Sequence, residues 1–347
     1  MKTSVKRVPG KSSRLRLRGA TVVLASIIVT ILCFEAGLQI HRRLSFLAAA
    51  RDGVKIFRKA GDRELIYEMT PGGRTIIGGI QYTINSAGFQ DDEFPIAPAG
   101  RRIVVIGDSV AYGLTVPMRK AFPQILEERL AAWACQGCAT PVVYNLGVAG
   151  YSTAQELRLL ETRVLEYKPD LILWNYVLND PATMDGGIAR YFVPPTLELL
   201  PVFEVAIAKL MPLSDRQRRA LQHKHDFYQF IHELHREEVQ SHFRKLGDIA
   251  KQWNVPIDIV LSQVFVYTLD GPYPWANLNE RIEELARDNG LGFVDLYELL
   301  KGYEPRQLSD DGLHPNIEGN EKIADVLLRI CFGSDGTLGV ARPSRGQ

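Results

Sequence analysis

Two short stretches, one in the first third of the chain and one near its end, carry residues suited to nucleophilic catalysis. Ser109 follows Gly107 and Asp108 at the end of an aliphatic run, and Asp311 precedes His314 by three residues. Serine catalysis needs a histidine base within hydrogen-bond reach of the hydroxyl and an acid that orients the imidazole. Taken singly, each stretch also fits an ordinary turn with a helix-capping side chain.

Two further stretches offer groups that could stabilise an oxyanion. "YNLGVAGYST" contains Gly147 and Gly150, and "NYVLNDP" contains Asn179 followed by Asp180. Acyl transfer needs N–H donors aimed at the oxygen of the tetrahedral intermediate, and a glycine backbone or an asparagine amide can supply them. Each stretch also has a simpler explanation, a glycine turn for the first and an Asx turn before Pro181 for the second.

Alternating strand and helix patterns must position these residues. Buried strands are predicted at residues 103–106, 142–146, 171–175, 257–261 and 292–295. Helices are predicted at residues 121–133, 153–167, 226–253, 275–289 and 317–331. This alternation predicts an α/β fold, a three-layer α/β/α sandwich with a five-stranded parallel sheet. The candidate residues follow strands or precede the last helix, where open parallel sheets place their ligands.

The order Ser, Gly, Asn, Asp-x-x-His resembles that of the SGNH (GDSL-like) hydrolase superfamily. The resemblance covers roughly residues 101–331, and "INSAGFQDDEF" upstream is similar to the lead-in of membrane-anchored bacterial members. It implies a flavodoxin-like fold in which Ser109 is the nucleophile, His314 the base and Asp311 its orienter. It also implies three oxyanion donors: the N–H of Ser109, the N–H of Gly150 and the side-chain amide of Asn179.

The resemblance implies a serine esterase acting on O-acyl or O-acetyl esters, with an acylated glycan of the cell envelope, or a lipid, as the expected substrate. Two alternatives remain open: an O-acyltransferase that uses the same acyl-enzyme, and a non-catalytic member that binds a glycan or a partner protein. No metal or organic cofactor is expected. Val177 stands where the family usually has glycine, so the sequence departs from the family pattern in the loop that carries Asn179. Ala111 excludes the Gly-x-Ser-x-Gly elbow of α/β-hydrolases.

The N-terminus predicts a membrane anchor. Residues 1–19 form a basic arm without acidic residues, and residues 20–40 are mostly apolar and carry no charge apart from Glu35. About 20 such residues suffice to span a bilayer, and the basic arm stays on the cytoplasmic side. We therefore expect a single-pass signal anchor in the cytoplasmic membrane, with the catalytic domain on the periplasmic or cell-surface side. A cleaved signal peptide is the competing interpretation, with small residues at 48–50, although the apolar stretch exceeds the usual length.

The remaining segments divide the chain further. Residues 41–100 are expected to form a juxtamembrane lead-in with short strands, and residues 101–332 the hydrolase domain. Within that domain, residues 181–256 form a long helical insertion that could cover the site as a lid. Residues 333–347 lack periodicity and are expected to be disordered.

Charge and cysteine content narrow the function classes. The net charge of +1 argues against nucleic-acid binding, which usually needs a concentrated basic face. Cys135 and Cys138 form "CQGC" before a strand, so a small loop disulfide or two inert thiols are expected rather than a redox motif. His232 and His235 have helical spacing for a metal pair, but their charged neighbours favour a solvated helix face.

Overall fold

The structure is a computed structural model. It describes residues 21–37 except 24 and 35, residues 56–134, 139–181, 188, 224–265 and 273–332. The basic arm, the pair Cys135 and Cys138, most of the predicted insertion and the C-terminal tail lie outside the described residues.

A five-stranded sheet forms the centre of the fold, and every neighbouring pair of strands is parallel. The strand order is β6-β5-β7-β8-β9, which is the flavodoxin-like order in which the chain changes direction beside the first strand. The strands are β5 (Arg102–Gly107), β6 (Val142–Asn145), β7 (Leu171–Tyr176), β8 (Ile257–Leu261) and β9 (Gly292–Asp295). The predicted parallel sheet is confirmed, with strand ends shifted by one residue at most.

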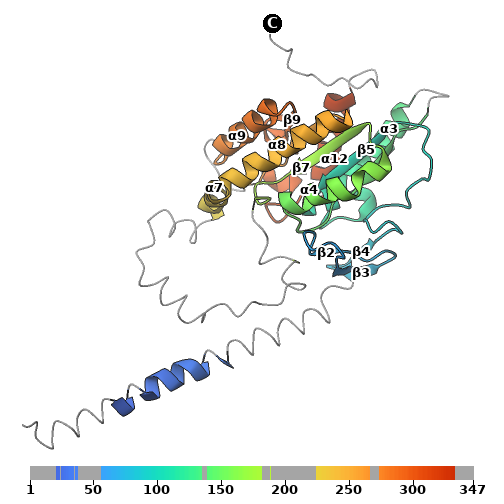
Figure 1. Ribbon diagram of the computed structural model, residues 1–347. Coiled ribbons are helices and arrows are strands. Elements are labelled where there is room, and N and C mark those ends of the chain that lie inside the picture. Colours follow the sequence, from blue (N-terminus) through green and yellow to red (C-terminus); the bar gives the residue numbers. More distant parts are fainter. Residues whose placement is uncertain are drawn as a thin grey trace, which may run out of the picture. The chain divides into compact units, whose positions relative to one another are not determined.

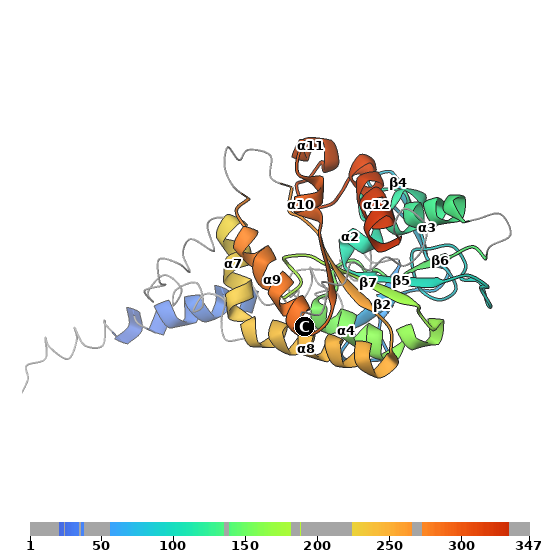
Figure 2. The ribbon, with the colours of Figure 1, turned by 90° about the horizontal axis from the view of Figure 1, so that it is seen from above.

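Helices cover both faces of this sheet (Figures 1 and 2). On β5, Ile103 and Val105 pack in one hydrophobic cluster while Val104 and Ile106 pack in another, because successive side chains of a strand point to opposite faces. The first cluster includes α3 (Phe122–Trp133), α10 (Leu296–Leu300) and α12 (Ile317–Phe332). The second includes α4 (Thr153–Thr162), α8 (Arg236–Trp253) and α9 (Ala276–Asp288). The three-layer prediction is therefore confirmed.

Two predicted helices are interrupted. The helix expected over residues 226–253 is two helices, α7 (Lys224–Leu234) and α8, because His235 leaves helical geometry at ψ 23°. The helix expected over residues 153–167 ends at Thr162, where Arg163 has a φ of −130° and a 3₁₀ turn, η2 (Val164–Tyr167), follows. The short elements α2 (Ser109–Tyr112), η1 (Met118–Lys120) and α11 (Pro305–Leu308) were not predicted, because three or four residues show no periodicity.

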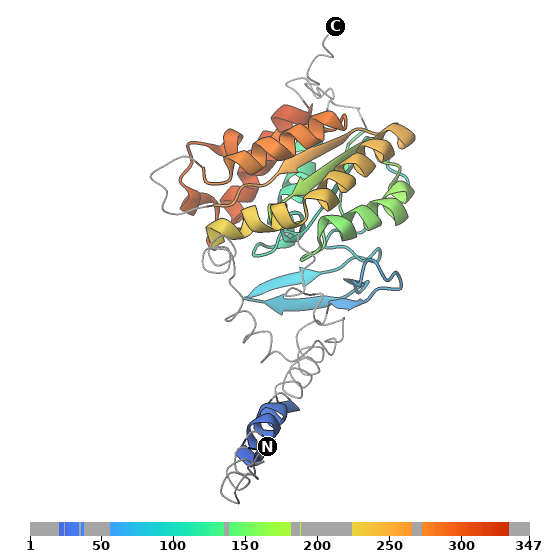
Figure 3. The same cartoon turned by 60° about the vertical axis from the view of Figure 1, so that its left-hand side comes forward.

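Two small hairpins precede the main sheet (Figure 3). Strand β1 (Phe57–Lys59) pairs with β2 (Tyr67–Met69), and β3 (Arg74–Ile77) pairs with β4 (Ile80–Thr83). Tyr67, Tyr82 and Phe89 are almost fully buried and belong to the same hydrophobic cluster as α4 and α8. The sequence pattern indicates a connecting region here, whereas these residues are an integral part of the core.

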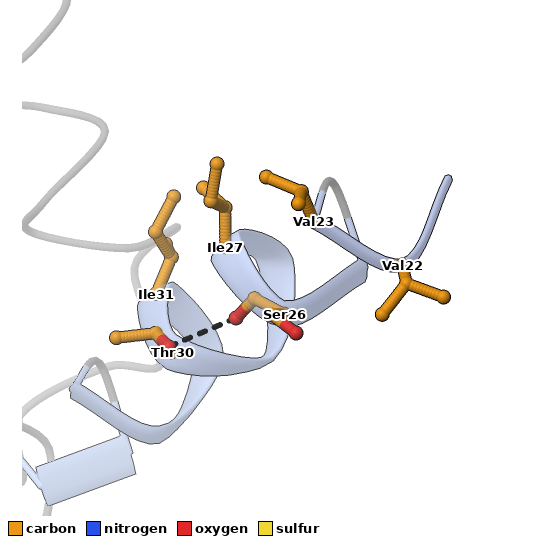
Figure 4. A pocket seen from close by; sticks show the side chains of 6 residues that line it. All are labelled: Val22, Val23, Ser26, Ile27, Thr30 and Ile31. Carbon is orange, nitrogen blue, oxygen red and sulfur yellow. Dashed lines mark hydrogen bonds between the residues drawn. The ribbon is translucent and has the colours of Figure 1, made fainter. Parts of the chain in front are cut away.

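The described residues between 21 and 37 form a helix. Most of its apolar side chains are exposed, with Val22 at 66% and Phe34 at 62%. Val23, Ile27 and Ile31 follow one another along one side of it, and the Thr30 hydroxyl donates to the Ser26 carbonyl at 2.8 Å (Figure 4). No helix within the described residues is long and apolar enough to cross a membrane.

Candidate active site

Ser109 is positioned by the sharp turn at the end of β5. A Cβ on Gly107 would lie 2.9 Å from the Asn175 carbonyl oxygen on β7, so only glycine fits between the two strands here. Asp108 caps α2 by accepting the Val110 N–H at 2.9 Å, which fixes the first helical turn. Ser109 is the first residue of that turn and is 8% exposed.

His314 lies between Ser109 and Asp311, in the loop that leads into α12. Its Nε2 is 3.0 Å from Ser109 Oγ, and its Nδ1 is 2.6 Å from Asp311 Oδ2. The other carboxylate oxygen, Oδ1 of Asp311, accepts the N–H groups of Leu313 at 2.9 Å and His314 at 2.8 Å. A carboxylate beside Nδ1 selects the tautomer in which Nδ1–H donates to the acid and the Nε2 lone pair faces the serine hydroxyl.

Asp311 is suited to stay ionised in this arrangement. Partial burial raises its pKa, but the hydrogen bonds from the His314 ring and the two backbone N–H groups outweigh burial, so that the pKa of Asp311 lies below its ordinary value. The neighbouring Asp310 does not contact the imidazole, and its Oδ1 lies 3.5 Å from Asn316 Nδ2. The structure thus brings together all three residues predicted for nucleophilic catalysis.

The predicted oxyanion donors come from the ends of three strands. Asn179 Nδ2 lies 3.4 Å from Asp108 Oδ2, and the same oxygen lies 3.2 Å from Ser109 Oγ. Gly150 has a φ of +80°, which favours glycine. Within the described residues, the backbone N–H groups of Ser109 and Gly150 have no hydrogen-bond acceptor, so both can bind a substrate oxygen.

The unusual Val177 does not disturb the loop that carries Asn179. The Val177 N–H donates to Asp180 Oδ2 at 2.7 Å, and the Asp180 N–H donates back to the Val177 carbonyl at 3.0 Å. Val177 itself is buried at 1% exposure. The reciprocal bonds close a tight turn in which the side chain of Asp180 supports the backbone, so glycine is not needed at position 177.

Two acidic side chains that interact electrostatically with Asp108 are buried, and their burial was not predicted. Glu156 on α4 and Asp180 are 0% and 1% exposed. Burial raises the pKa of Glu156 well above its ordinary value and the charge of Asp108 adds to this, while the Trp174 indole counteracts it in part. Burial likewise raises the pKa of Asp180, with Glu156 and Asp108 as further causes. Burial therefore favours the protonated form of both carboxyls over the charged form.

The interpretation of the histidine pair as a solvated helix face is wrong for His232. This side chain is 2% exposed, and its Nε2 lies 3.0 Å from the carbonyl oxygen of Leu178, next to Asn179. Burial lowers the pKa of His232 to about 4, so the ring is neutral at physiological pH. His235 does lie on the charged side, where its Nδ1 meets Glu238 at 2.6 Å. The described residues contain no group of three His, Cys, Asp or Glu side chains that could hold a metal ion.

Comparison with known proteins identifies the family. The model of the GDSL-like lipase/acylhydrolase family matches residues 105–322. This chain belongs to that family. Members of this family hydrolyse esters, and the matched region begins inside β5 and ends inside α12.

Several solved structures are similar to the GDSL-like hydrolase. An acetylxylan esterase from Geobacillus stearothermophilus, as a catalytic mutant, shares 17% identity at a TM-score of 0.43, over 67% of this chain and 94% of its own. A lipase/acylhydrolase from Enterococcus faecalis shares 19% identity at a TM-score of 0.41, over 66% and 94%. The psychrotrophic esterase EstA from Pseudoalteromonas sp. shares 15% identity at a TM-score of 0.40, over 65% and 94%. None of the curated proteins compared with the chain matches it.

Proposed function

We propose that the chain hydrolyses O-acyl esters by covalent catalysis at Ser109. The observation that carries the proposal is the position of the His314 ring, 3.0 Å from the serine hydroxyl on one side and 2.6 Å from Asp311 on the other. Ser109 Oγ attacks the ester carbonyl while His314 Nε2 takes its proton, and the protonated imidazole then gives that proton to the leaving alcohol. Water then attacks the carbonyl of the acyl-enzyme with His314 again as base, and the carboxylic acid is released as the Ser109 hydroxyl forms again.

The negative oxygen of the tetrahedral intermediate is stabilised by three donors in this proposal. Within the described residues, the backbone N–H groups of Ser109 and Gly150 donate to no protein acceptor. The Asn179 amide and Ser109 Oγ both lie beside Oδ2 of Asp108. Such donors act mainly in the transition state, and the loss of one typically lowers kcat by about 100- to 1000-fold.

As substrate we propose an O-acetyl or other O-acyl ester carried by a glycan of the cell envelope. The support is the predicted export of the catalytic domain, which would place it where such esters occur. The exposed apolar helix between residues 21 and 37 supports a further proposal, that the enzyme is held at the cytoplasmic membrane with its site outside. The proposals on the substrate and on the attachment to the membrane do not depend on the chemistry at Ser109.

The test combines a covalent probe with substrates of increasing length. The purified full-length chain is treated with a fluorophosphonate, which labels activated serines, and assayed on p-nitrophenyl esters from acetate upward and on acetylated glycans. We expect labelling at Ser109, no labelling of Ser109→Ala, and the fastest turnover on short acyl chains. A chain that neither labels nor hydrolyses any ester would refute the proposal. Acyl transfer to an added sugar in preference to water would instead identify an O-acyltransferase.

A further inference from the structure

The peptide unit between Ala149 and Gly150 is bound by a residue that lies outside the region matched by the family. The hydroxyl of Tyr67, on β2, donates to the Ala149 carbonyl oxygen at 2.8 Å across 82 positions of the chain. Tyr67 is 0% exposed. A Cβ on Gly150 would lie 3.0 Å from the same hydroxyl, so the phenol packs directly against this glycine.

The other neighbour of Gly150 binds Tyr67 as well. The hydroxyl of Tyr151 donates to the backbone carbonyl of Tyr67 at 2.6 Å. The two rings meet edge to face, with centroids 5.2 Å apart. Two residues that flank Gly150 thus bind one hairpin residue, one through its side chain and one through its backbone, and the loop cannot rotate without breaking both bonds.

Planarity of the peptide bond links this contact to the site. The carbonyl of Ala149 and the N–H of Gly150 belong to the same peptide unit, which is trans, so they point in opposite directions within one plane. A hydrogen bond that fixes the direction of the carbonyl therefore fixes the direction of the N–H. It also polarises the unit and strengthens the N–H as a donor.

We propose that Tyr67 is a positioning residue of the oxyanion hole, which aims the Gly150 N–H at the substrate oxygen by holding the Ala149 carbonyl. The inference rests on the proposed function, because Gly150 is taken there as an oxyanion donor. Burial raises the pKa of the Tyr67 phenol, with Tyr151 and Asp108 as further causes, so its hydroxyl keeps the proton that it donates.

Steady-state kinetics of Tyr67→Phe in the full-length chain test the catalytic part. We expect kcat to fall about 10-fold with KM unchanged, because a misaimed donor weakens only the transition state and is less damaging than a deleted one. Tyr82→Phe is the matched control: its hydroxyl also joins a hairpin to the hydrolase core, but it accepts the Thr115 N–H at 3.2 Å. The kcat of this control should stay within about twofold of the wild-type value, because the Tyr82 hydroxyl does not bind the peptide unit of Ala149 and Gly150. A folded Tyr67→Phe with wild-type kcat would overturn the proposal.

A spectroscopic readout tests the geometry without activity. In a chain labelled with ¹³C′-alanine and ¹⁵N-glycine, carbonyl-filtered NMR detects only glycines that follow alanine, which are Gly37, Gly61, Gly88, Gly100 and Gly150. We expect the Gly150 signal to move in Tyr67→Phe and to stay in place in Tyr82→Phe. A stationary signal would overturn the proposal, whereas a moved signal in a chain with no esterase activity would sustain the positioning and refute only the proposed function.

Tyr151→Phe keeps the proposal testable if Tyr67→Phe does not fold. This change removes the bond to the Tyr67 carbonyl and leaves the Tyr67 hydroxyl in place. We expect a smaller fall in kcat, about two- to fivefold, with KM unchanged, because the loop is loosened rather than released. A folded Tyr151→Phe with unchanged kcat and an unmoved Gly150 signal would overturn the proposal.

Discussion

Nε2 of His314 lies 3.0 Å from the hydroxyl oxygen of Ser109, although 205 positions separate the two residues in the chain. Parallel strand order makes this possible, because β5 ends beside the loop that precedes α12. The two side chains act as one unit in proton transfer, and their substitutions should not be additive.

Ser109→Ala and His314→Ala should each lower kcat by several orders of magnitude, and the double variant should be hardly worse than either one. Each single variant already prevents formation of the acyl-enzyme, because the serine needs its base and the base needs its serine. The second substitution therefore lowers kcat hardly further. Hydrolysis of a p-nitrophenyl ester measures this. An additive double variant, or a near-active Ser109→Ala, would contradict the assignment of the nucleophile.

Asp311→Ala should be the mildest of the three catalytic substitutions and should still lower kcat by about 100-fold or more. Asp311 orients the imidazole at 2.6 Å without touching the substrate. Asp310→Ala is the matched control, because its carboxylate faces Asn316 at 3.5 Å instead of His314. Parallel kcat measurements decide between the two aspartates, and greater damage from Asp310→Ala would mean that the structure pairs the wrong acid with the imidazole.

Asn179→Ala should lower kcat about 100-fold and leave KM nearly unchanged, since the amide binds the oxyanion more strongly than the ground-state carbonyl. A rise in KM at constant kcat would instead assign Asn179 to substrate binding. Asn316→Ala serves as control, because it removes an asparagine amide from the loop before α12, where it binds the Gln307 carbonyl at 3.0 Å.

Glu156→Gln should make folding less sensitive to alkaline pH. Burial raises the pKa of Glu156 above its ordinary 4.5, so above that pH the unfolded chain releases a proton that the folded chain retains. Stability therefore falls as pH rises from about 4.5 towards the folded pKa, by up to about 1.4 kcal/mol per pH unit. Glutamine has no proton to release, and its variant should lose much of this slope.

Urea unfolding at about pH 5 and about pH 8 measures the Glu156 effect through the difference in unfolding free energy. Glu166→Gln, on the exposed side of η2, removes an acid without burial and should keep the wild-type pH dependence. Equal slopes for wild type and Glu156→Gln would show that Glu156 ionises in the folded chain.

If the proposed N-terminal anchor is correct, a tag placed before residue 1 should stay on the protein, and a reporter fused after residue 50 should be active only outside the cytoplasm. Ile27→Arg should weaken membrane retention, because a charge in the middle of the apolar stretch disfavours insertion. Ile76→Arg, at an exposed position of β3, should not change retention. Loss of the tag during export would indicate a cleaved signal peptide.

Local sequence patterns were sufficient for the main sheet, whereas the catalytic residues were recognised only from the order of four motifs together. Ile103 to Ile106 are buried and β-branched, and such a run favours a strand covered on both faces. The Asp-x-x-His spacing alone also fits an ordinary turn, and the resemblance to the family implied its catalytic role. In the structure, the three-residue turn brings Asp311 to the imidazole at 2.6 Å. These features depend on neighbours along the chain, which the sequence displays directly.

The sequence pattern could not predict contacts between segments that are far apart in the chain. Tyr67 stands in a run of alternating apolar residues that indicates a buried position, but nothing in that run names Ala149 as its partner. His232 was expected at the surface because its neighbours are charged, whereas the packing of α7 against the Leu178 loop buries it. The local pattern predicts on which face of a helix or strand a residue lies. Which residues pack against that face depends on the whole fold.

The hairpins before the main sheet also decide where this enzyme can be divided or recombined. Similarity to the family begins at residue 105, yet the Gln155 amide binds the Leu65 carbonyl at 2.8 Å and the Arg158 side chain binds Asp62 at 2.7 Å. A version that begins at residue 105 would retain the nucleophile, the base and the acid. It would lack Tyr67, whose hydroxyl binds the loop that carries Gly150. The catalytic unit therefore includes the hairpin of β1 and β2, and a graft of the shorter segment onto another carrier would lack part of the support of the site.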